Sequence, residues 1–201
     1  QCSPVPGGSD AGNVCCGESV IMEGKVKSNR KIQICRASGQ RLREAAEIVE
    51  TVDRLMDHRE WFVAESLEEF ERWMKQGKGI LYLAVDADTG EAGGMFFAVI
   101  PGMDPENLGY DIGMEETELD QVALMDTAAV LPGFRGYNLQ YRMMQAAEQD
   151  LQKMGYRYLL CTVHPENRFS RENVKRQGYR KVMTKEKYGG YLRDIWLKEL
   201  K

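Results

Sequence analysis

The sequence predicts one α/β domain whose mixed sheet is antiparallel in its N-terminal half and parallel at its centre, with helices flanking it. Residues 79–85 and 92–101 read as strands and meet at Asp86-Ala87-Asp88-Thr89-Gly90, whose Asp and Gly residues suit a hairpin turn. Residues 122–131 and 156–163 are nearly continuous apolar runs joined by a helical segment, and such a crossover favours parallel pairing. An antiparallel meander therefore leads into a parallel central pair.

The composition of the 201 residues, 43% of them hydrophobic, is that of one domain with a well-filled core. The 27 Lys and Arg residues against 31 Asp and Glu, a net charge of −4, argue against a sequence-independent grip on nucleic acid. Five cysteines without paired Cys-x-x-Cys spacing support neither a disulfide framework nor a zinc site, so no metal is expected. Without a membrane-length apolar window or a signal pattern, we expect a cytoplasmic protein that does not contact membranes.

Residues 1–30 are expected to form an N-terminal arm in front of a domain that occupies residues 31–201. The start of the chain is rich in Gly, Ser and Pro and shows neither helical nor strand periodicity. The vicinal pair Cys15-Cys16 is interpreted as incidental rather than redox-active, because its surroundings offer little that lowers a thiol pKa.

The domain begins with a strand and two helices. Residues 31–36 alternate as a half-buried strand does, and an apolar stripe then predicts a helix from Ser38-Gly39 to about residue 58. A second, short helix is predicted for residues 67–75. The hairpin comes next, and the acidic segment 102–121 connects it to the central strand.

The second half alternates helices and strands. Apolar residues recur at helical spacing over residues 137–154, and Gly155 is placed to end that helix. Residues 167–177 predict a short helix with Asn167 as its N-terminal cap and Gly178 as its stop. Residues 179–185 and 191–200 are expected to close the chain as two strands around Tyr188-Gly189-Gly190.

The connection between the central strand and its helix is the segment Phe134-Arg135-Gly136-Tyr137-Asn138. Gly and Asn tolerate unusual dihedral angles, and the first unpaired N–H groups of the helix emerge here. With the positive charge of Arg135, the segment predicts an anion-binding site. It has neither the Gly-Lys-Ser/Thr of a Walker loop nor the Gly-x-Gly-x-x-Gly of a dinucleotide fingerprint. The alternative is an ordinary connection capped by Asn138.

The segment LPGFRGYNLQ, with the helix, the strand and the segment HPENRFSRENVKRQGY that follow it, resembles the GNAT superfamily of acyl-CoA N-acyltransferases over roughly residues 31–200. The resemblance implies a GNAT-like mixed sheet whose central parallel strands splay around CoA, with acetyl-CoA as the co-substrate. It also implies that the central strand faces pantetheine and that the turn binds the pyrophosphate. The donor-binding residues assigned in this way are Ala129, Val130, Leu131, Arg135, Gly136, Tyr137, Asn138, Leu139, Gln140, Asn167 and Asn173. Asn138 and Gln140 stand where the family usually has glycines.

Acyl transfer to an amine needs a base for the amine and an acid for the leaving thiolate. Asp126 is the only charge inside the apolar central strand, alternation puts it on the side of Val130, and the resemblance supports it as the base. Alternatively, its carboxylate is satisfied by neighbouring backbone or exposed where the strands splay. The family's frequent tyrosine falls on Val174, so Tyr188 and Tyr191 are the candidate acids, with unassisted departure of the thiolate as the rival.

Two reactive side chains near the predicted cleft are expected to have no catalytic role. His164 follows a strand that should flank the cleft, and it is interpreted as a residue that caps its own loop. Cys161 lies in the middle of that strand, so we do not expect a route through an acyl-cysteine.

These patterns are compatible with the activity that the resemblance implies, an N-acyltransferase that moves an acetyl group from acetyl-CoA directly to a primary amine of a small molecule or peptide. Residues 102–121 hold seven carboxylates and no basic residue, which favours a cationic acceptor unless the segment is a solvated loop. The rival class is a non-catalytic acyl-CoA-binding or regulatory module, favoured by Val174 and by the altered glycines. A homodimer is compatible with the sequence.

Overall fold

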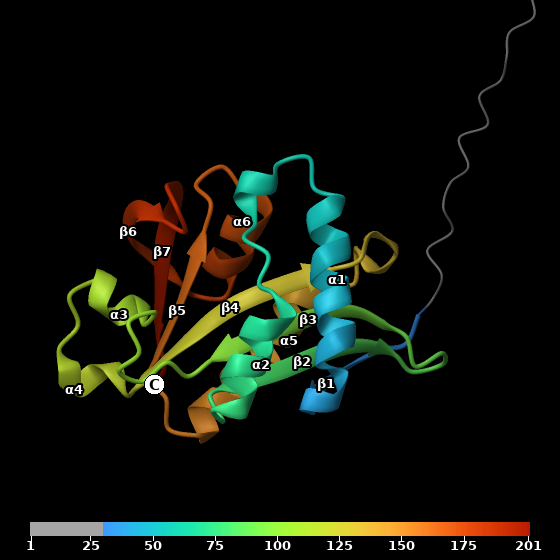
Figure 1. The fold of residues 1–201 in the computed structure, drawn as a ribbon, viewed down its shortest axis with the longest axis horizontal. Helices are drawn as coiled ribbons and strands as arrows, with labels where there is room; N and C mark the ends of the chain where they lie inside the picture. The colour runs from blue at the N-terminus through green and yellow to red at the C-terminus, as the bar shows by residue number, and fades with distance from the viewer. Residues whose placement is uncertain (1–29) are drawn as a thin grey trace, which may run out of the picture.

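The computed structural model describes residues 30–201, which form one sheet with helices packed on it (Figure 1). The expected arm and its Cys15-Cys16 pair lie outside the described residues, apart from Arg30. In the described part of the chain, no helix is long and apolar enough to cross a membrane. Among the same residues, no group of three or more His, Cys, Asp or Glu side chains is arranged to hold a metal ion.

The sheet has seven strands in the order β1-β2-β3-β4-β5-β7-β6. The strands are β1 (Ile32–Ala37), β2 (Gly79–Asp86), β3 (Ala92–Val99), β4 (Val122–Val130), β5 (Tyr158–Val163), β6 (Arg180–Lys187) and β7 (Tyr191–Glu199). Neighbouring strands pair antiparallel except β4 and β5, which pair in parallel. The predicted mixed sheet, with an antiparallel meander feeding a parallel central pair, is therefore confirmed.

Two larger helices and several shorter ones connect the strands. The α-helices are α1 (Leu42–Arg54), α2 (Leu67–Lys75), α3 (Leu108–Asp111), α4 (Glu116–Leu119), α5 (Leu139–Lys153) and α6 (Arg168–Arg176). Three 3₁₀ turns complete them: η1 (Gly39–Arg41), η2 (Arg59–Trp61) and η3 (Pro132–Phe134). Gly155 and Gly178, both at positive φ, follow α5 and α6 as predicted, and the Asn167 side chain caps α6.

The sheet is covered on both faces. The apolar stripe of α1 packs with Leu81, Met95 and Phe97 in one cluster of buried residues, and α2 joins it through Phe70 and Trp73. A second cluster on the opposite face gathers the buried side of α5 with strand residues of the other parity. Every residue of β3 is consequently buried, as expected for a strand with helices on both sides. Figure 1 shows α1 and α2 crossing the near face.

Two segments differ from the sequence prediction. Helix α1 ends at Arg54 rather than near residue 58, and Leu55 and Met56, which follow it, line a cleft. The acidic segment is not a plain loop, since it folds into α3 and α4. Asn107 organises it: the buried amide donates to the carbonyls of Gly102 (2.7 Å) and Leu119 (3.2 Å).

Candidate active site

The centre of the sheet opens where β4 and β5 separate. Their parallel pairing runs only from Val122↔Tyr158 to Leu124↔Leu160, and beyond Leu124 the two strands diverge. On its other edge β4 contains a bulge, since Phe97 pairs with Thr127 and Ala98 with Met125, which leaves Asp126 between them without a partner in β3. A bulge bends and twists its strand. The chain thus directs β4 away from β5 at the one acidic residue of the strand.

The bulge also changes the alternation that the sequence suggested. Before it, Leu124 packs in the cluster beneath α1, and after it Ala129 packs there, so the parity of the buried face switches at Asp126. The extra residue shifts the register by one, so no single alternation runs through the whole strand. From Asp126 onward the alternation holds, and Asp126 and Val130 line the same cleft as the sequence suggested.

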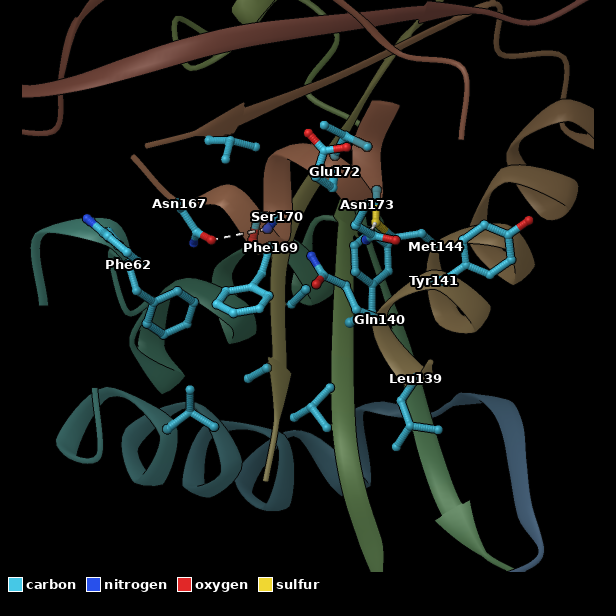
Figure 2. A pocket seen from close by; sticks show the side chains of 18 of the residues that line it. Phe62, Leu139, Gln140, Tyr141, Met144, Asn167, Phe169, Ser170, Glu172 and Asn173 are labelled. Atoms are coloured by element: carbon cyan, nitrogen blue, oxygen red, sulfur yellow. Dashed lines mark hydrogen bonds between the residues drawn. The ribbon is translucent and has the colours of Figure 1, made fainter. Parts of the chain in front are cut away.

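This cleft has a volume of about 1300 Å³ and runs from the β4 bulge to the first turn of α5. Its walls come from β4, the turn after it, α5 and α6, and from the segment that follows α1. Figure 2 shows Gln140 and Asn173 beside Phe169 at the start of α6, with Phe62 approaching from the opposite wall. Phe169 is 86% exposed, an unusual position for a phenylalanine. Sequence reasoning missed both aromatic residues, because nothing in their local pattern marks them.

The turn at the start of α5 leaves the helix N-terminus open to the cleft. Gly136 has φ 91° and Asn138 has φ 55°, which are left-handed conformations that suit Gly and Asn. The Asn138 side chain forms no capping hydrogen bond, so the alternative of an ordinary capped connection does not describe this turn. Leu139 and Gln140, whose backbone N–H groups belong to the first turn, line the cleft together with Arg135. The arrangement suits an anion.

Most of the predicted donor-binding residues line this one cleft. They are Ala129, Val130, Arg135, Gly136, Asn138, Leu139, Gln140, Asn167 and Asn173. Leu131 and Tyr137 do not line it and instead pack against the hydrophobic core behind the turn. The polar atoms of Asn173 contact Met144 and Gln177 at 3.5 and 3.2 Å, so its amide belongs to the contact between α5 and α6.

A second, smaller cavity of about 510 Å³ lies beside the first. Four of its lining residues also line the large cleft: Met125, Asp126, Cys161 and Thr162. The remaining walls include Glu65 and Glu69 from α2 and the segment before it, Glu106 from the acidic segment, and Tyr188 from the β6–β7 turn. The two cavities therefore meet where β4 and β5 separate, with Asp126 at the junction.

Asp126 has the environment of a base. Its residue surface is accessible through the cavities. The cavity walls nevertheless surround the carboxylate and partly remove it from water, and this desolvation raises its pKa to about 6. The hydroxyl of Thr127 donates to it at 2.9 Å and opposes the rise, while the negative charges of Glu106 and Glu69 add to it. A group with this pKa is mostly ionised at neutral pH and still accepts a proton readily.

Glu65 is a carboxyl group that sequence reasoning missed. Burial, followed by the charge of Asp126 and contact with Glu69, raises its pKa to about 9, so it keeps its proton at neutral pH. Glu69 is held by a capping box, in which Ser66 N donates to its carboxylate at 2.9 Å and Glu69 N donates to Ser66 Oγ at 3.3 Å. The Ser-x-x-Glu pattern of residues 66–69 was the available signal, although it reports a helix start and not a cavity.

The two candidate acids differ in position. The Tyr188 hydroxyl lies 3.3 Å from Thr162 Oγ1 at the junction, and burial raises its pKa to about 12, so the phenol holds its proton. Tyr191 lines neither cavity. Val174, at the family's tyrosine position, is buried in the core under α6. Of the side chains considered as acids, only the Tyr188 phenol reaches the junction.

The other reactive groups have structural environments. Burial raises the pKa of the Cys161 thiol to about 12, which keeps it protonated and unreactive as a nucleophile. His164 accepts a hydrogen bond from Glu166 N through Nδ1 at 3.2 Å, the loop contact that was predicted for it.

The acidic segment contributes less to the cavity than its composition suggested. Asp111 forms ion pairs with Lys185 (2.6 Å) and Lys187 (2.5 Å) from β6, and Glu118 accepts a hydrogen bond from the Tyr158 hydroxyl (2.7 Å). Glu106 is the one carboxylate of the segment that lines the small cavity. Glu106 forms an ion pair with Arg72 of α2 at 2.7 Å. The cavity also contains the carboxyl groups of Glu65 and Glu69 and the ammonium group of Lys187.

Comparison with known proteins extends to structure only, since no family model and no curated protein matches the sequence. An N-acetyltransferase from Staphylococcus aureus Mu50 superposes with a TM-score of 0.64 at 14% identity, covering 85% of this chain and 99% of its own. The ribosomal-protein-S18-alanine N-acetyltransferase from Escherichia coli gives 0.63 at 13% identity, with coverages of 84% and 94%. A chain of the NatC complex bound to Gag peptide and CoA superposes with a TM-score of 0.64 at 13% identity, covering 85% of this chain and 99% of its own.

These matches establish the fold of the chain. Two structures described as acetyltransferases of the GNAT family superpose on 85% and 84% of this chain with TM-scores of 0.63 and 0.60. The protein thus has the GNAT fold, and its neighbours in structure are acyltransferases. One fold can carry several activities, so the function of this chain depends on the residues of its own two cavities.

Proposed function

We propose that this protein is an N-acyltransferase that moves an acetyl group from acetyl-CoA directly to a primary amine of a cationic small molecule or peptide. The observation that carries the proposal is the meeting of two cavities of different character at Asp126. One is suited to an anionic, extended donor and the other to a positively charged acceptor. Two substrates that enter from different sides and meet at a base are what direct transfer requires.

The donor side is argued from backbone geometry. Leu131 N donates to Gly93 O in β3 at 2.9 Å, so alternation turns the N–H of Val130 toward the side where β5 has separated. That edge of β4 offers pantetheine a strand-like partner and offers an N–H to the oxyanion of the tetrahedral intermediate. The pyrophosphate then reaches the open N-terminus of α5 and the guanidinium of Arg135.

The chemical step uses the groups at the junction. The acceptor ammonium loses a proton to Asp126, directly or through a water that the carboxylate orients, and the free amine attacks the thioester carbon. A C–N bond forms, and the N–H of Val130 stabilises the oxyanion. As the C–S bond breaks, the thiolate takes a proton from the Tyr188 phenol by way of the Thr162 hydroxyl. The amide nitrogen releases its remaining excess proton to solvent, from which Tyr188 is reprotonated. Asp126 then releases the proton of the acceptor to solvent, which completes the cycle.

The test separates this proposal from its rival, a non-catalytic acyl-CoA-binding or regulatory module. CoA and acetyl-CoA at saturating concentration should raise the melting temperature, because a ligand that binds only the folded state stabilises it. Free thiol released from acetyl-CoA should then be measured with a panel of cationic, neutral and anionic primary amines. Release that depends on a cationic amine supports the enzyme. A melting shift without amine-dependent release identifies the binding module, and no melting shift at all refutes both.

A further inference from the structure

Arg193 of β7 is a buried cation without an acidic partner. It is 2% exposed, and no carboxylate among residues 30–201 forms an ion pair with it. Its guanidinium donates instead to two backbone carbonyls, that of Leu192 at 2.8 Å and that of Glu60 at 2.9 Å. Burying a charge in this way is costly, and desolvation accordingly lowers the pKa of Arg193. A costly arrangement of this kind invites a functional explanation.

The faces of two tyrosine rings provide the rest of its surroundings. The guanidinium carbon lies 5.7 Å from the ring centroid of Tyr188 and 5.5 Å from that of Tyr191, within the range of a cation–π contact. Tyr188 and Tyr191 flank the β6–β7 turn. Arg193 therefore joins this turn to the η2 segment, 133 positions earlier in the chain.

Each end of this connection reaches a different cavity. Trp61, which follows the carbonyl that Arg193 binds, lines the large cleft, where its ring stacks on His58 with centroids 4.4 Å apart. Tyr188 lines the small cavity, and its hydroxyl contacts Thr162, which belongs to both. One guanidinium thus holds a wall residue of each cavity.

Tyr188 needs such support because its backbone is strained. Its φ is 52°, a left-handed conformation that a bulky residue rarely adopts, and it persists only where surrounding contacts hold it. Gly189 and Gly190 follow with φ of 83° and 109°. Because glycine is conformationally permissive, these residues do little to fix the backbone of Tyr188. The contacts of the Tyr188 side chain are therefore what fix the hydroxyl at the junction: Thr162 at its tip and Arg193 over its ring.

We propose that Arg193 is a positioning residue that holds the Tyr188 hydroxyl on Thr162 and the Trp61 segment against β7, and thereby aligns the two cavities for transfer. The kinetic part of this proposal rests on the proposed function. The structural part does not, because the position of Tyr188 can be measured whether or not the protein is an acyltransferase.

The experiment combines kinetics with a spectroscopic probe. Arg193→Met removes the charge but keeps a side chain of similar length. Arg193→Lys keeps the charge but lacks the planar guanidinium that donates to two carbonyls. The matched control is Arg180→Met, which changes an exposed arginine paired with Glu199. We expect Arg193→Met to lower kcat roughly tenfold, with a smaller loss for Arg193→Lys, an unchanged Kd for CoA and no effect of Arg180→Met. In the Tyr188→Phe background the same Arg193→Met change should cost less than about twofold, because the two residues act through one contact.

The probe is 3-fluorotyrosine incorporated at position 188. Removing the guanidinium should broaden or move its ¹⁹F signal and raise the pH at which the phenol ionises, since a nearby cation favours the phenolate. If Arg193→Met does not fold, Arg193→Lys carries both measurements. An unchanged ¹⁹F signal, or an equal loss of kcat with and without the Tyr188 hydroxyl, would overturn the proposal. A protein without transfer activity but with the expected ¹⁹F change would refute the proposed function and leave the positioning role standing.

Discussion

The two cavities of this protein differ in the groups that they present to a ligand. The large cleft presents backbone N–H groups, at the free edge of β4 and the open N-terminus of α5, and its conformation depends on Gly136 and Asn138. The small cavity presents side chains, chiefly the carboxyl groups around Asp126. Backbone recognition needs one continuous stretch of chain, whereas the acidic cavity is assembled from five separate segments. Variants in the two cavities should therefore affect donor and acceptor separately.

The largest effect is expected at the junction itself. Asp126→Asn should lower turnover on the order of a hundredfold to a thousandfold, because it removes the general base, while donor affinity stays unchanged. In the wild type, kcat/KM for the acceptor should rise with pH through about 6, as Asp126 loses its proton. The variant should lack this rise and recover part of the loss at alkaline pH, where more free amine is present.

Asp120→Asn, in the acidic segment but outside both cavities, is the control. Wild-type turnover across pH in Asp126→Asn would remove Asp126 from the mechanism.

A change in the donor turn should produce the next largest effect. Gly136→Glu puts a side chain at φ 91° and a negative charge beside the anion site, so CoA affinity should fall at least roughly tenfold while the acceptor KM is little changed. Gly133→Glu adds the same charge to the same turn, at a position where a Cβ meets open space and φ is unexceptional. Isothermal titration with CoA compares the two. Equal affinities would show that the donor anion binds elsewhere.

Glu65→Gln should stabilise the fold at alkaline pH. The pKa of Glu65 is about 9 in the folded protein against an ordinary 4.5, so between these values the folded state holds more protons than the unfolded state. The free energy of unfolding then falls as pH rises through this window. Gln does not titrate, so the variant does not lose stability in this way. After allowance for partial solvent screening we expect a gain of about 1 kcal/mol, or roughly 2–4 °C in Tm, above pH 8.

The same variant should leave CoA affinity unchanged. It should raise the KM for a cationic amine only near and above pH 9, where the Glu65 carboxyl group ionises and its charge attracts the amine. Glu68→Gln changes an exposed carboxylate on the first turn of α2 and is its matched control. Thermal melts from pH 5 to 9 and acceptor kinetics check both parts. A Tm gain that does not grow with pH would mean that Glu65 ionises normally.

The smallest effect is expected in the acidic segment. Glu106→Gln should raise the acceptor KM by about twofold to fivefold at low ionic strength, and the difference should shrink near 0.15 M salt, where the screening length is about 8 Å. Glu116→Gln removes a carboxylate that lines neither cavity and should leave KM unchanged. The acceptor KM of both variants and of the wild type should be measured at low and at 0.15 M salt. Equal effects of the two substitutions would make the whole segment, rather than Glu106, the source of attraction.

The two regions also differ in how far the sequence revealed them. The turn before α5 is local in sequence: an apolar strand, Pro132-Gly133, and Gly and Asn before an amphipathic helix indicate their own backbone geometry. Most of the residues that line the large cleft at this turn could therefore be identified from the sequence. Leu131 and Tyr137 lie in the same stretch but pack toward the core and do not line the cleft. Residue spacing does not determine which way a side chain points in an irregular turn.

The acceptor side required the folded chain. The carboxylates of residues 102–121 formed a clear composition signal, but β6 neutralises Asp111 and only Glu106 reaches the cavity. Glu65 reads as an ordinary polar residue before a helix, and its pKa of about 9 arises from burial beside Asp126, 61 positions away. Long-range neighbours of this kind come from strand order and helix packing, which periodicity does not encode.

The sequence by itself determined the mixed sheet, most of its element boundaries, the open turn before α5 and the candidate base at Asp126, because each depends on hydrophobic period, turn chemistry or a single charge in an apolar run. Only the tertiary structure decided that Asp126 sits on a β-bulge between two cavities, that Tyr188 rather than Tyr191 faces the junction, and that Arg193 lies against them. The register between β3 and β4 and the contact between η2 and β7 join residues distant in the chain, and their geometry is set by packing.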